Sequence, residues 1–296
     1  MRPWPVREEA VWRWLMVAPT ALFLMAFTLA PVGLLVALSV NRLAWSAGRA
    51  QWTFVGLQNF ADLAGDVLLQ ASFWNTLFFA VIAVSIQMLL GLGLALLTSG
   101  SHRGRTVYRT IFLLPMLLPG IVIGAIWKLM YGFDYGVINQ LLDLAGLDPQ
   151  NWLGSRRLAL GSIIVVDVWH WTPFCYLLLL AGLEALPQDV YEAARIDGAG
   201  AWGALRHITL PLLLPAITAT FIFRLILAFK VFDEVYLLTG GGPGTATEVI
   251  SFTIYRRFFT EDRAGYGAAM ALVTCLLILV LVSGAALAGR RLRRTP

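Results

Sequence analysis

The sequence predicts an all-α membrane protein with six transmembrane helices, and three observations carry this prediction. Of its 296 residues, 59% are hydrophobic and only 13% are charged, whereas an ordinary soluble domain has roughly 25% charged residues. The mean hydropathy of +0.76 lies outside the soluble globular range. Apolar windows long enough to cross a bilayer core, which takes about 20 residues per helix, recur along the chain.

These windows follow one another closely. They cover residues 14–40, 74–97, 107–131, 158–183, 212–236 and 266–288. The intervals leave no long stretch for a separate soluble domain, so residues 1–296 are expected to form a single membrane domain. Basic residues precede the first window, but a signal peptide has an apolar region of only about 7–15 residues. We therefore expect this window to remain as a span.

The distribution of arginine predicts the orientation of the spans, because positive residues resist translocation during insertion. If the amino terminus is cytoplasmic, more of the arginines fall in cytoplasmic segments, among them Arg105, Arg195 and Arg290. Both termini are then cytoplasmic, and so is the loop over residues 184–210. Topology signals and anionic lipid headgroups account for the net charge of +5, so no nucleic acid partner is needed.

The third window contains helix-breaking and small residues. Pro115 and Pro119 are expected to kink the helix. Gly120 and Gly124 then give it a small-residue face that favours close packing against a neighbouring helix.

A short, bounded helix is predicted within the loop 184–210. Pro187 can occupy the first helical position, where its missing N–H costs nothing. Asp189 then lies in the first turn and Arg195 in the last, each matched to the helix dipole. Glu192 and Arg195 are within pairing distance on one face. Gly198 supplies a left-handed stop, so positive φ is expected there.

This segment resembles a known family. The pattern Glu-Ala-Ala, three residues, Gly, nine residues, Ile, one residue, Leu-Pro marks the permeases of binding-protein-dependent ABC importers. This sequence meets it without a gap at Glu192, Ala193, Ala194, Gly198, Ile208, Leu210 and Pro211. Elsewhere the chain is similar to the carbohydrate-uptake branch of that family, in the segments FVGLQNF, FWNTLFF, DVWHWTPF and FKVFDEVYLLTGGGPGTATE.

The resemblance implies a fold, a role and a set of partners. The fold would be that of a type I ABC importer permease, in the inner membrane of a bacterial or archaeal cell. The short helix would be the coupling helix, which seats on a cytoplasmic ATPase through Glu192, Ala193, Ala194, Asp197 and Gly198. The partners would be a second, homologous permease that completes a heterodimer, two copies of the ATP-binding subunit and an extracytoplasmic solute-binding protein, together with membrane lipid.

The chain lacks the motifs of an enzyme. It has no G-x-x-x-x-G-K-[ST] loop, and its only lysines are Lys128 and Lys230. It also has no H-E-x-x-H or G-x-S-x-G motif, so catalytic residues and a metal site are not predicted. We expect no cofactor on this chain, with ATP and Mg used by the partner ATPase.

Ionisable residues within the spans are costly and therefore mark candidate functional positions. The fifth window contains Arg224 near its middle and Lys230, Asp233 and Glu234 toward its end, the last three on one expected helix face. They could form an internal salt bridge, or they could line the solute pathway with Arg224 and Asp167 deeper inside. The sequence leaves both possibilities open.

Aromatic residues in the fourth window add two further candidates. Trp169 and Trp171 could belong to an interfacial belt, or their rings could stack on the apolar faces of a sugar. Pro173 offers a break in this helix that could open backbone groups to a cavity. The glycine-rich segment 239–248 cannot form regular structure and is expected to be an external loop.

Together these features predict a membrane subunit of an ATP-driven importer that forms half of the pathway for a sugar or sugar-like solute. The alternative is a stand-alone secondary transporter or channel for a small polar solute. Such a protein is expected to contain inverted internal repeats, and this sequence shows no such symmetry.

Overall fold

The computed structural model describes residues 6–46, 49–100 and 104–292. The chain divides into two compact units, one formed by residues 1–65 and 254–274 and the other by residues 66–253 and 275–296. Within the described residues, five helices are long and apolar enough to cross a membrane, or six if one sharply bent pair forms a span.

The first unit begins with a long apolar helix. α1 (Val6–Ser39) is followed by a hairpin of β1 (Asn41–Ser46) and β2 (Arg49–Phe54), which pair antiparallel with Asn41 opposite Phe54. α2 (Gln58–Leu63) follows, and its Asn59 amide donates to the carbonyls of Ser39 at 2.8 Å and Asn41 at 3.2 Å. The π-helical turn η3 (Arg256–Thr260) and the start of α13 (Ala264–Leu292) complete this unit.

The second unit contains most of the helices. In chain order they are α3 (Val67–Thr98), α4 (Arg105–Leu113), the 3₁₀ turn η1 (Leu114–Leu117), α5 (Gly120–Met130), α6 (Val137–Leu144), α7 (Ala159–Glu184), α8 (Gln188–Ile196), α9 (Ala201–Ala204), the π-helical turn η2 (Leu205–Thr209), α10 (Leu210–Phe229), α11 (Asp233–Leu238) and α12 (Ile250–Tyr255), whose end reaches the first unit.

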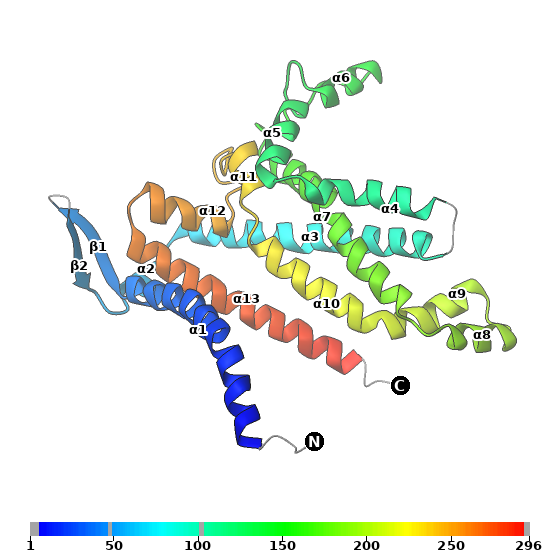
Figure 1. Ribbon diagram of the computed structural model, residues 1–296. Coiled ribbons are helices and arrows are strands. Elements are labelled where there is room, and N and C mark those ends of the chain that lie inside the picture. The colour runs from blue at the N-terminus through cyan, green and yellow to red at the C-terminus, as the bar shows by residue number, and fades with distance from the viewer. Residues whose placement is uncertain (1–5, 47–48, 101–103, 293–296) are drawn as a thin grey trace. The chain divides into compact units, whose positions relative to one another are not determined.

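Helices α3, α7 and α10 lie side by side and form the core of this unit (Figure 1). Their buried apolar side chains include Phe79, Ile163 and Leu179. Gly91 sets the close approach of α3 to α7, because a Cβ at this position would lie 2.8 Å from the Cβ of Cys175. The close contact depends on the absence of a side chain at Gly91.

The third predicted span is broken, not merely kinked. The helices on either side of the break differ in direction by 92°. Leu118 is extended, with ψ of 135°, as expected for a residue that precedes proline. The predicted small-residue contact is confirmed, because Cβ atoms at Gly120 and Gly124 would lie 2.6 Å from Asp233 Oδ2 and 2.7 Å from Leu237.

The span predicted over residues 212–236 lies within one candidate span, Ala201–Leu238, but it is not one regular helix. α10 ends at Phe229, residues 230–232 are not helical, and α11 begins at Asp233. Lys230, Asp233 and Glu234 therefore do not share a helix face. Ser251 contributes to this break, since its hydroxyl donates to the carbonyl of Val231.

The glycine-rich segment after α11 is irregular, as predicted, but it is held in place by side chains. The hydroxyls of Thr239 and Thr247 lie 2.7 Å apart. The amide of Asn75 on α3 donates to the carbonyls of Thr245 at 2.8 Å and Glu248 at 2.9 Å. This segment is thus bonded to α3 and is not a free loop.

Candidate functional site

The loop between α7 and α10 contains the short helix that the sequence predicts. α8 ends at Ile196, and Gly198 follows with φ of +78°. Its N–H donates to the carbonyl of Arg195 at 3.1 Å, and the N–H of Ala199 donates to that of Ala194 at 2.9 Å. These bonds form a Schellman motif, which confirms the positive φ predicted for Gly198.

The start of α8 differs slightly from the prediction. Pro187 lies at the N-cap position with ψ of 132°, one residue before the first helical position. Asp189 is in the first turn and Arg195 in the last, as predicted. Although three residues apart, Glu192 and Arg195 form no ion pair with each other in the described structure.

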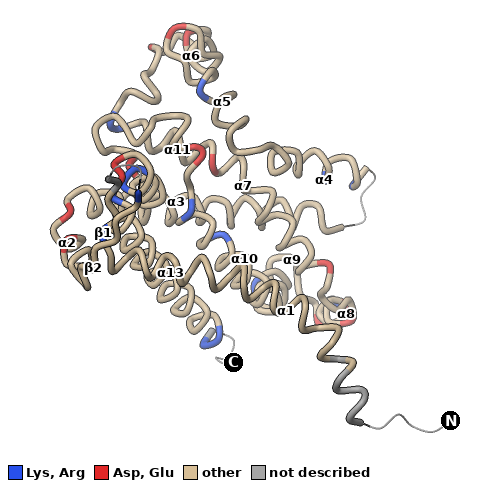
Figure 2. Tube along the Cα trace, turned by 60° about the vertical axis from the view of Figure 1, so that its left-hand side comes forward, with Lys and Arg blue, Asp and Glu red and all other residues tan. Residues whose placement is uncertain are grey.

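The side chains of α8 divide between an inner and an outer face. On the inner face Ala194 is buried, and the Tyr191 hydroxyl lies 3.0 Å from that of Thr209. On the outer face Glu192 and Ala193 are exposed. Figure 2 shows acidic residues grouped along this short helix, whereas α3 carries no charge along its length.

Sequence reasoning missed two exposed apolar residues of this loop. Ile196 at the end of α8 is 87% exposed, and Trp202 on α9 is 72% exposed. Exposed apolar side chains of this size can contact either a partner protein or a membrane surface. The helical periodicity of residues 188–196 could have placed Ile196 on the outer face with Glu192.

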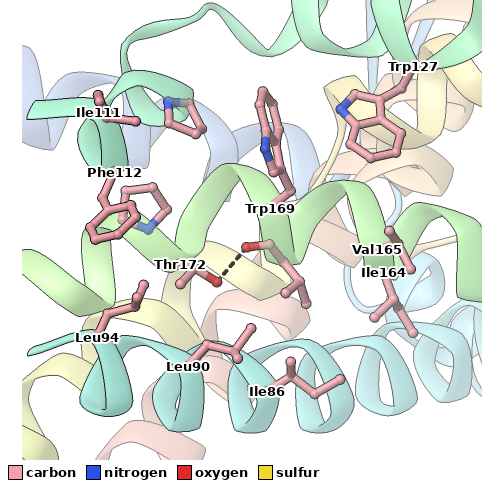
Figure 3. A pocket seen from close by; sticks show the side chains of 13 residues that line it. Ile86, Leu90, Leu94, Ile111, Phe112, Trp127, Ile164, Val165, Trp169 and Thr172 are labelled. Atoms are coloured by element: carbon pink, nitrogen blue, oxygen red, sulfur yellow. Dashed lines mark hydrogen bonds between the residues drawn. The ribbon is translucent and has the colours of Figure 1, made fainter. Parts of the chain in front are cut away.

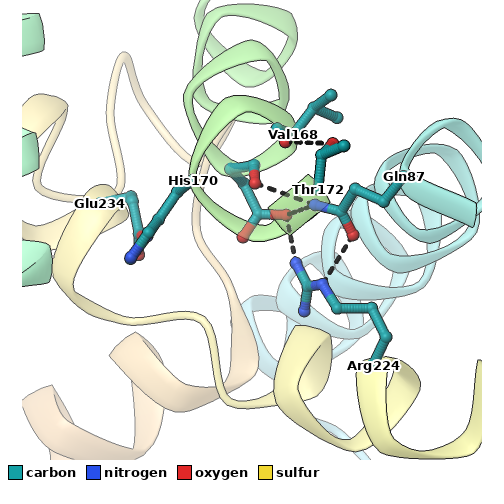
Figure 4. A network of polar contacts seen from close by, with 7 residues as sticks. Gln87, Val168, His170, Thr172, Arg224 and Glu234 are labelled. Atoms are coloured by element: carbon teal, nitrogen blue, oxygen red, sulfur yellow. Dashed lines mark hydrogen bonds and ion pairs between the residues drawn. The ribbon is translucent and has the colours of Figure 1, made fainter. Parts of the chain in front are cut away.

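The intramembrane residues Asp167 and Arg224 come together in a buried polar network (Figure 4). Arg224 pairs with Asp167 Oδ2, and its Nε donates to Gln87 Oε1 at 2.6 Å. The Gln87 amide donates in turn to Asp167 Oδ2 at 2.8 Å and to the Asp167 carbonyl at 2.9 Å. Three helices, α3, α7 and α10, each contribute one member. The sequence signal for Gln87 was an amide side chain within the apolar span 74–97, a signal that Asn75 gives as well.

The remaining charged candidates lie around the break between α10 and α11. Glu234 is buried and its carboxylate lies 3.0 Å from His170 Nδ1 on α7. Lys230 and Asp233 are exposed. The Asp233 carboxylate packs against Gly120, the first residue of α5, where a negative charge complements the helix dipole.

The two candidate tryptophans of α7 occupy different surroundings. The Trp171 ring lies 5.4 Å from Arg224 Cζ, which gives the arginine a cation–π contact. Trp169 projects into a groove of about 630 Å³ between α7, α3 and the bent pair α4 and α5 (Figure 3). The Trp127 ring meets that of Trp169 edge to face in this groove, with centroids 5.8 Å apart.

The groove at Trp169 is almost entirely apolar. Its one hydroxyl, that of Thr172, already donates to the Val168 carbonyl at 2.6 Å. Pro173 also lines the groove, but α7 continues through it, so the predicted break in this helix is wrong. Packing on both sides of α7 holds the helix together despite the missing N–H. The hydroxyl groups of a sugar would therefore find few hydrogen-bond partners in this groove.

Replacing Arg224 by alanine leaves Asp167 buried without its counterion, which should lower the free energy of unfolding by about 3–5 kcal/mol. Lys230→Ala is the control. This lysine is exposed and lies six residues further along, so its replacement should change the free energy of unfolding by less than about 0.5 kcal/mol. Denaturant unfolding in mixed micelles measures the free energy of unfolding of both variants. Equal stability of the two variants would show that the network does not hold the helices.

Comparison with known proteins bears on the function of these features. Residues 87–294 match the family model described as the inner membrane component of binding-protein-dependent transport systems. The trehalose/maltose transport system permease protein MalF of Thermococcus litoralis is 40% identical over 92% of this chain and 91% of its own. The trehalose transport system permease protein SugA of Mycobacterium tuberculosis is 33% identical over 90% of this chain and 86% of its own.

Solved structures show the same fold. A chain of a bacterial alginate ABC transporter, crystallised with a periplasmic protein that holds an alginate pentasaccharide, superposes with a TM-score of 0.85. The match covers 100% of this chain and 99% of that chain at 24% identity. The family match covers most of the chain and includes α8, the buried network and the helix breaks. The chain belongs to the family of inner membrane components of binding-protein-dependent transport systems.

Proposed function

We propose that this chain is the membrane-spanning subunit of an ATP-driven importer and forms half of the pathway for a sugar or sugar-like solute. The strongest support is the capped helix α8 with its exposed outer face, in a chain that belongs to this family. The relatives named above are trehalose and maltose permeases, which favours a carbohydrate as the solute.

We propose six spans, with α4 and α5 together forming the third, and with both termini in the cytoplasm. On this topology α8 and α9 face the cytoplasm, where they would contact an ATP-binding subunit. Glu192 would form a polar contact, while Ile196 and Trp202 would insert as apolar anchors. Gly198 would fix where the helix ends, so that a movement of the ATPase reaches the spans as a rigid-body shift.

The proposed assembly also contains a second, homologous permease, a second ATP-binding subunit and an extracytoplasmic solute-binding protein. The exposed apolar side chains of α1, such as Leu22, Phe23 and Leu24, suit either lipid or a partner permease. Hydrolysis of ATP with Mg would take place on the ATP-binding subunits, in the inner membrane of a bacterial or archaeal cell.

The intramembrane candidates would divide between two roles. Lys230 and Asp233 are exposed where α10 is interrupted, close to the interrupted third span, and interrupted helices at membrane depth typically line cavities. We therefore assign these two residues to the solute pathway. Asp167, Arg224 and Glu234, all buried and paired, would keep that pathway in shape, with Trp171 beside Arg224 and Trp169 on the lipid or partner side.

Dependence on an ATPase partner tests the importer proposal most simply. The chain alone in liposomes should transport no sugar, whereas the complex with ATP-binding subunits and binding protein should transport it only with ATP. Uptake of labelled trehalose and maltose measures this difference. Sugar-specific flux through the chain alone, without ATP, would overturn the proposal.

The role of α8 can be tested at two positions. Gly198→Val forces a β-branched residue into positive φ, at a cost of about 1 kcal/mol or more, and misplaces the helix end. Glu192→Lys reverses a charge on the outer face. Both should insert in the membrane yet lose solute-stimulated ATPase activity. Gly203→Ala, where a Cβ meets nothing within 4 Å, is the control; normal stimulation in both test variants would contradict the role.

Asp233 provides the test of the pathway. Asp233→Ala should reduce solute-stimulated ATPase activity several-fold while the yield of assembled complex stays at the wild-type level, because alanine keeps the Cβ that packs against Gly120 and the lost carboxylate is exposed. Asp148→Ala, at an exposed carboxylate between α6 and α7, controls for loss of charge. If stimulation persists in Asp233→Ala, or yield and stimulation fall together, Asp233 does not line the pathway.

A further inference from the structure

A polar cavity of about 660 Å³ lies beside the inner face of α8. It is bounded by the ends of α3 and α7 and by the beginnings of α4 and α8, all within the second unit. Its volume is within the usual range for small-molecule sites. The outer face of α8 has no part in it, so the cavity is separate from the surface assigned above to the ATPase.

Two arginines give this cavity a positive charge. Arg105 at the start of α4 and Arg195 in the last turn of α8 both line it. Within the described part of the chain, neither guanidinium forms an ion pair or a side-chain hydrogen bond. The one carboxylate in the lining, that of Glu184, is neutralised by Arg109, whose Nη2 lies 2.7 Å from Glu184 Oε1.

Other donors converge on the same space. Gln188 and the bonded pair of Tyr191 and Thr209 line it with an amide and hydroxyl groups. α4 begins there after Gly104, with no side-chain cap and no acidic residue in its first turn. The start of this nine-residue helix therefore favours a nearby anion through its dipole.

The depth of the cavity indicates which anion would reach it. Leu96 and Leu183 line it from within the last turns of α3 and α7, and the polar lining begins directly after them at Ser99 and Glu184. The cavity thus lies where apolar spans end, which is the level of the phosphate groups of a bilayer.

We propose that this cavity binds a phosphate group, either that of an anionic phospholipid headgroup or free inorganic phosphate. Guanidinium groups bind phosphate through paired charge-assisted hydrogen bonds, and two of them face this space from different helices. A bound phosphate would bridge α4 and α8, so it would fix the inner face of α8 to the third span. The site requires no transport activity or partner subunit, and it extends beyond the proposed function.

Binding to the full chain, purified in a neutral detergent, tests this proposal. Three probes are titrated: a short-chain phosphatidylglycerol, a phosphatidylcholine of equal acyl length, and inorganic phosphate. The wild type should bind phosphatidylglycerol more tightly than phosphatidylcholine. R105Q and R195Q should each weaken that binding by about tenfold, and the double variant further. R206Q, an exposed arginine of the same loop outside the cavity, should bind as the wild type does.

The titrations of the three probes distinguish a lipid headgroup from free inorganic phosphate as the source of the bound phosphate group. If inorganic phosphate also binds and displaces phosphatidylglycerol, and R105Q and R195Q weaken both, the cavity accepts free phosphate. If only phosphatidylglycerol binds in an arginine-dependent way, the ligand is a lipid headgroup. Equal binding of the two lipids, or phosphatidylglycerol binding that survives in both single variants, would overturn the proposal. Gel filtration of each variant identifies any loss of fold, and because the assay measures no transport, its failure would leave the importer proposal untouched.

Discussion

A charged side chain in a membrane span must find its counterion within the protein, and in this chain Arg224 meets that requirement. The cost of an unpaired charge in a low-dielectric interior is several kcal/mol, so the spans that supply its partners must stay at a fixed distance. Asp167 on α7 and Gln87 on α3 supply them. Close packing at Gly91 brings α3 near enough to α7 for this arrangement. The network thus sets the spacing of the three central helices.

The same requirement explains how the charges near the end of α10 are arranged. Glu234 turns inward only because His170 on α7 is within 3.0 Å. Glu234 lies on α11, directly after the interruption at residues 230–232 that separates this helix from α10. Lys230 and Asp233 have no such buried partner and remain exposed. The fold therefore separates charges that are paired between the helices from charges that stay exposed.

The sequence could predict the features that depend on local chemistry. Apolar length located the long helices, with both ends of α7 within one residue but the start of α3 seven residues too late. Gly198 with Pro187 bounded α8, because helix ends follow from single residues. The sequence could not predict the pairing of Arg224 with Asp167 and Gln87, since these contacts join residues 57 and 137 positions apart. A polar residue in a span signals that a partner exists but does not identify it.

The positions of the helix breaks are harder to predict from the sequence than the positions of the helices. Pro115 and Pro119 indicated a bend, but the 92° angle depends on where Asp233 and Leu237 pack against Gly120 and Gly124. The end of α10 at Phe229 has no proline or glycine to mark it. The hairpin of β1 and β2 lies between two apolar windows, in a stretch whose apolar length carries no signal for strands.

A double-mutant cycle tests whether Arg224 and Asp167 hold the helices together as a pair. The free energy of unfolding in mixed micelles is measured for Arg224→Met, Asp167→Leu and the double variant. If the two charges compensate each other, each single change is severe, the double change is milder than either, and the coupling energy exceeds about 2 kcal/mol. Additive losses, with no coupling between the two positions, would contradict the account.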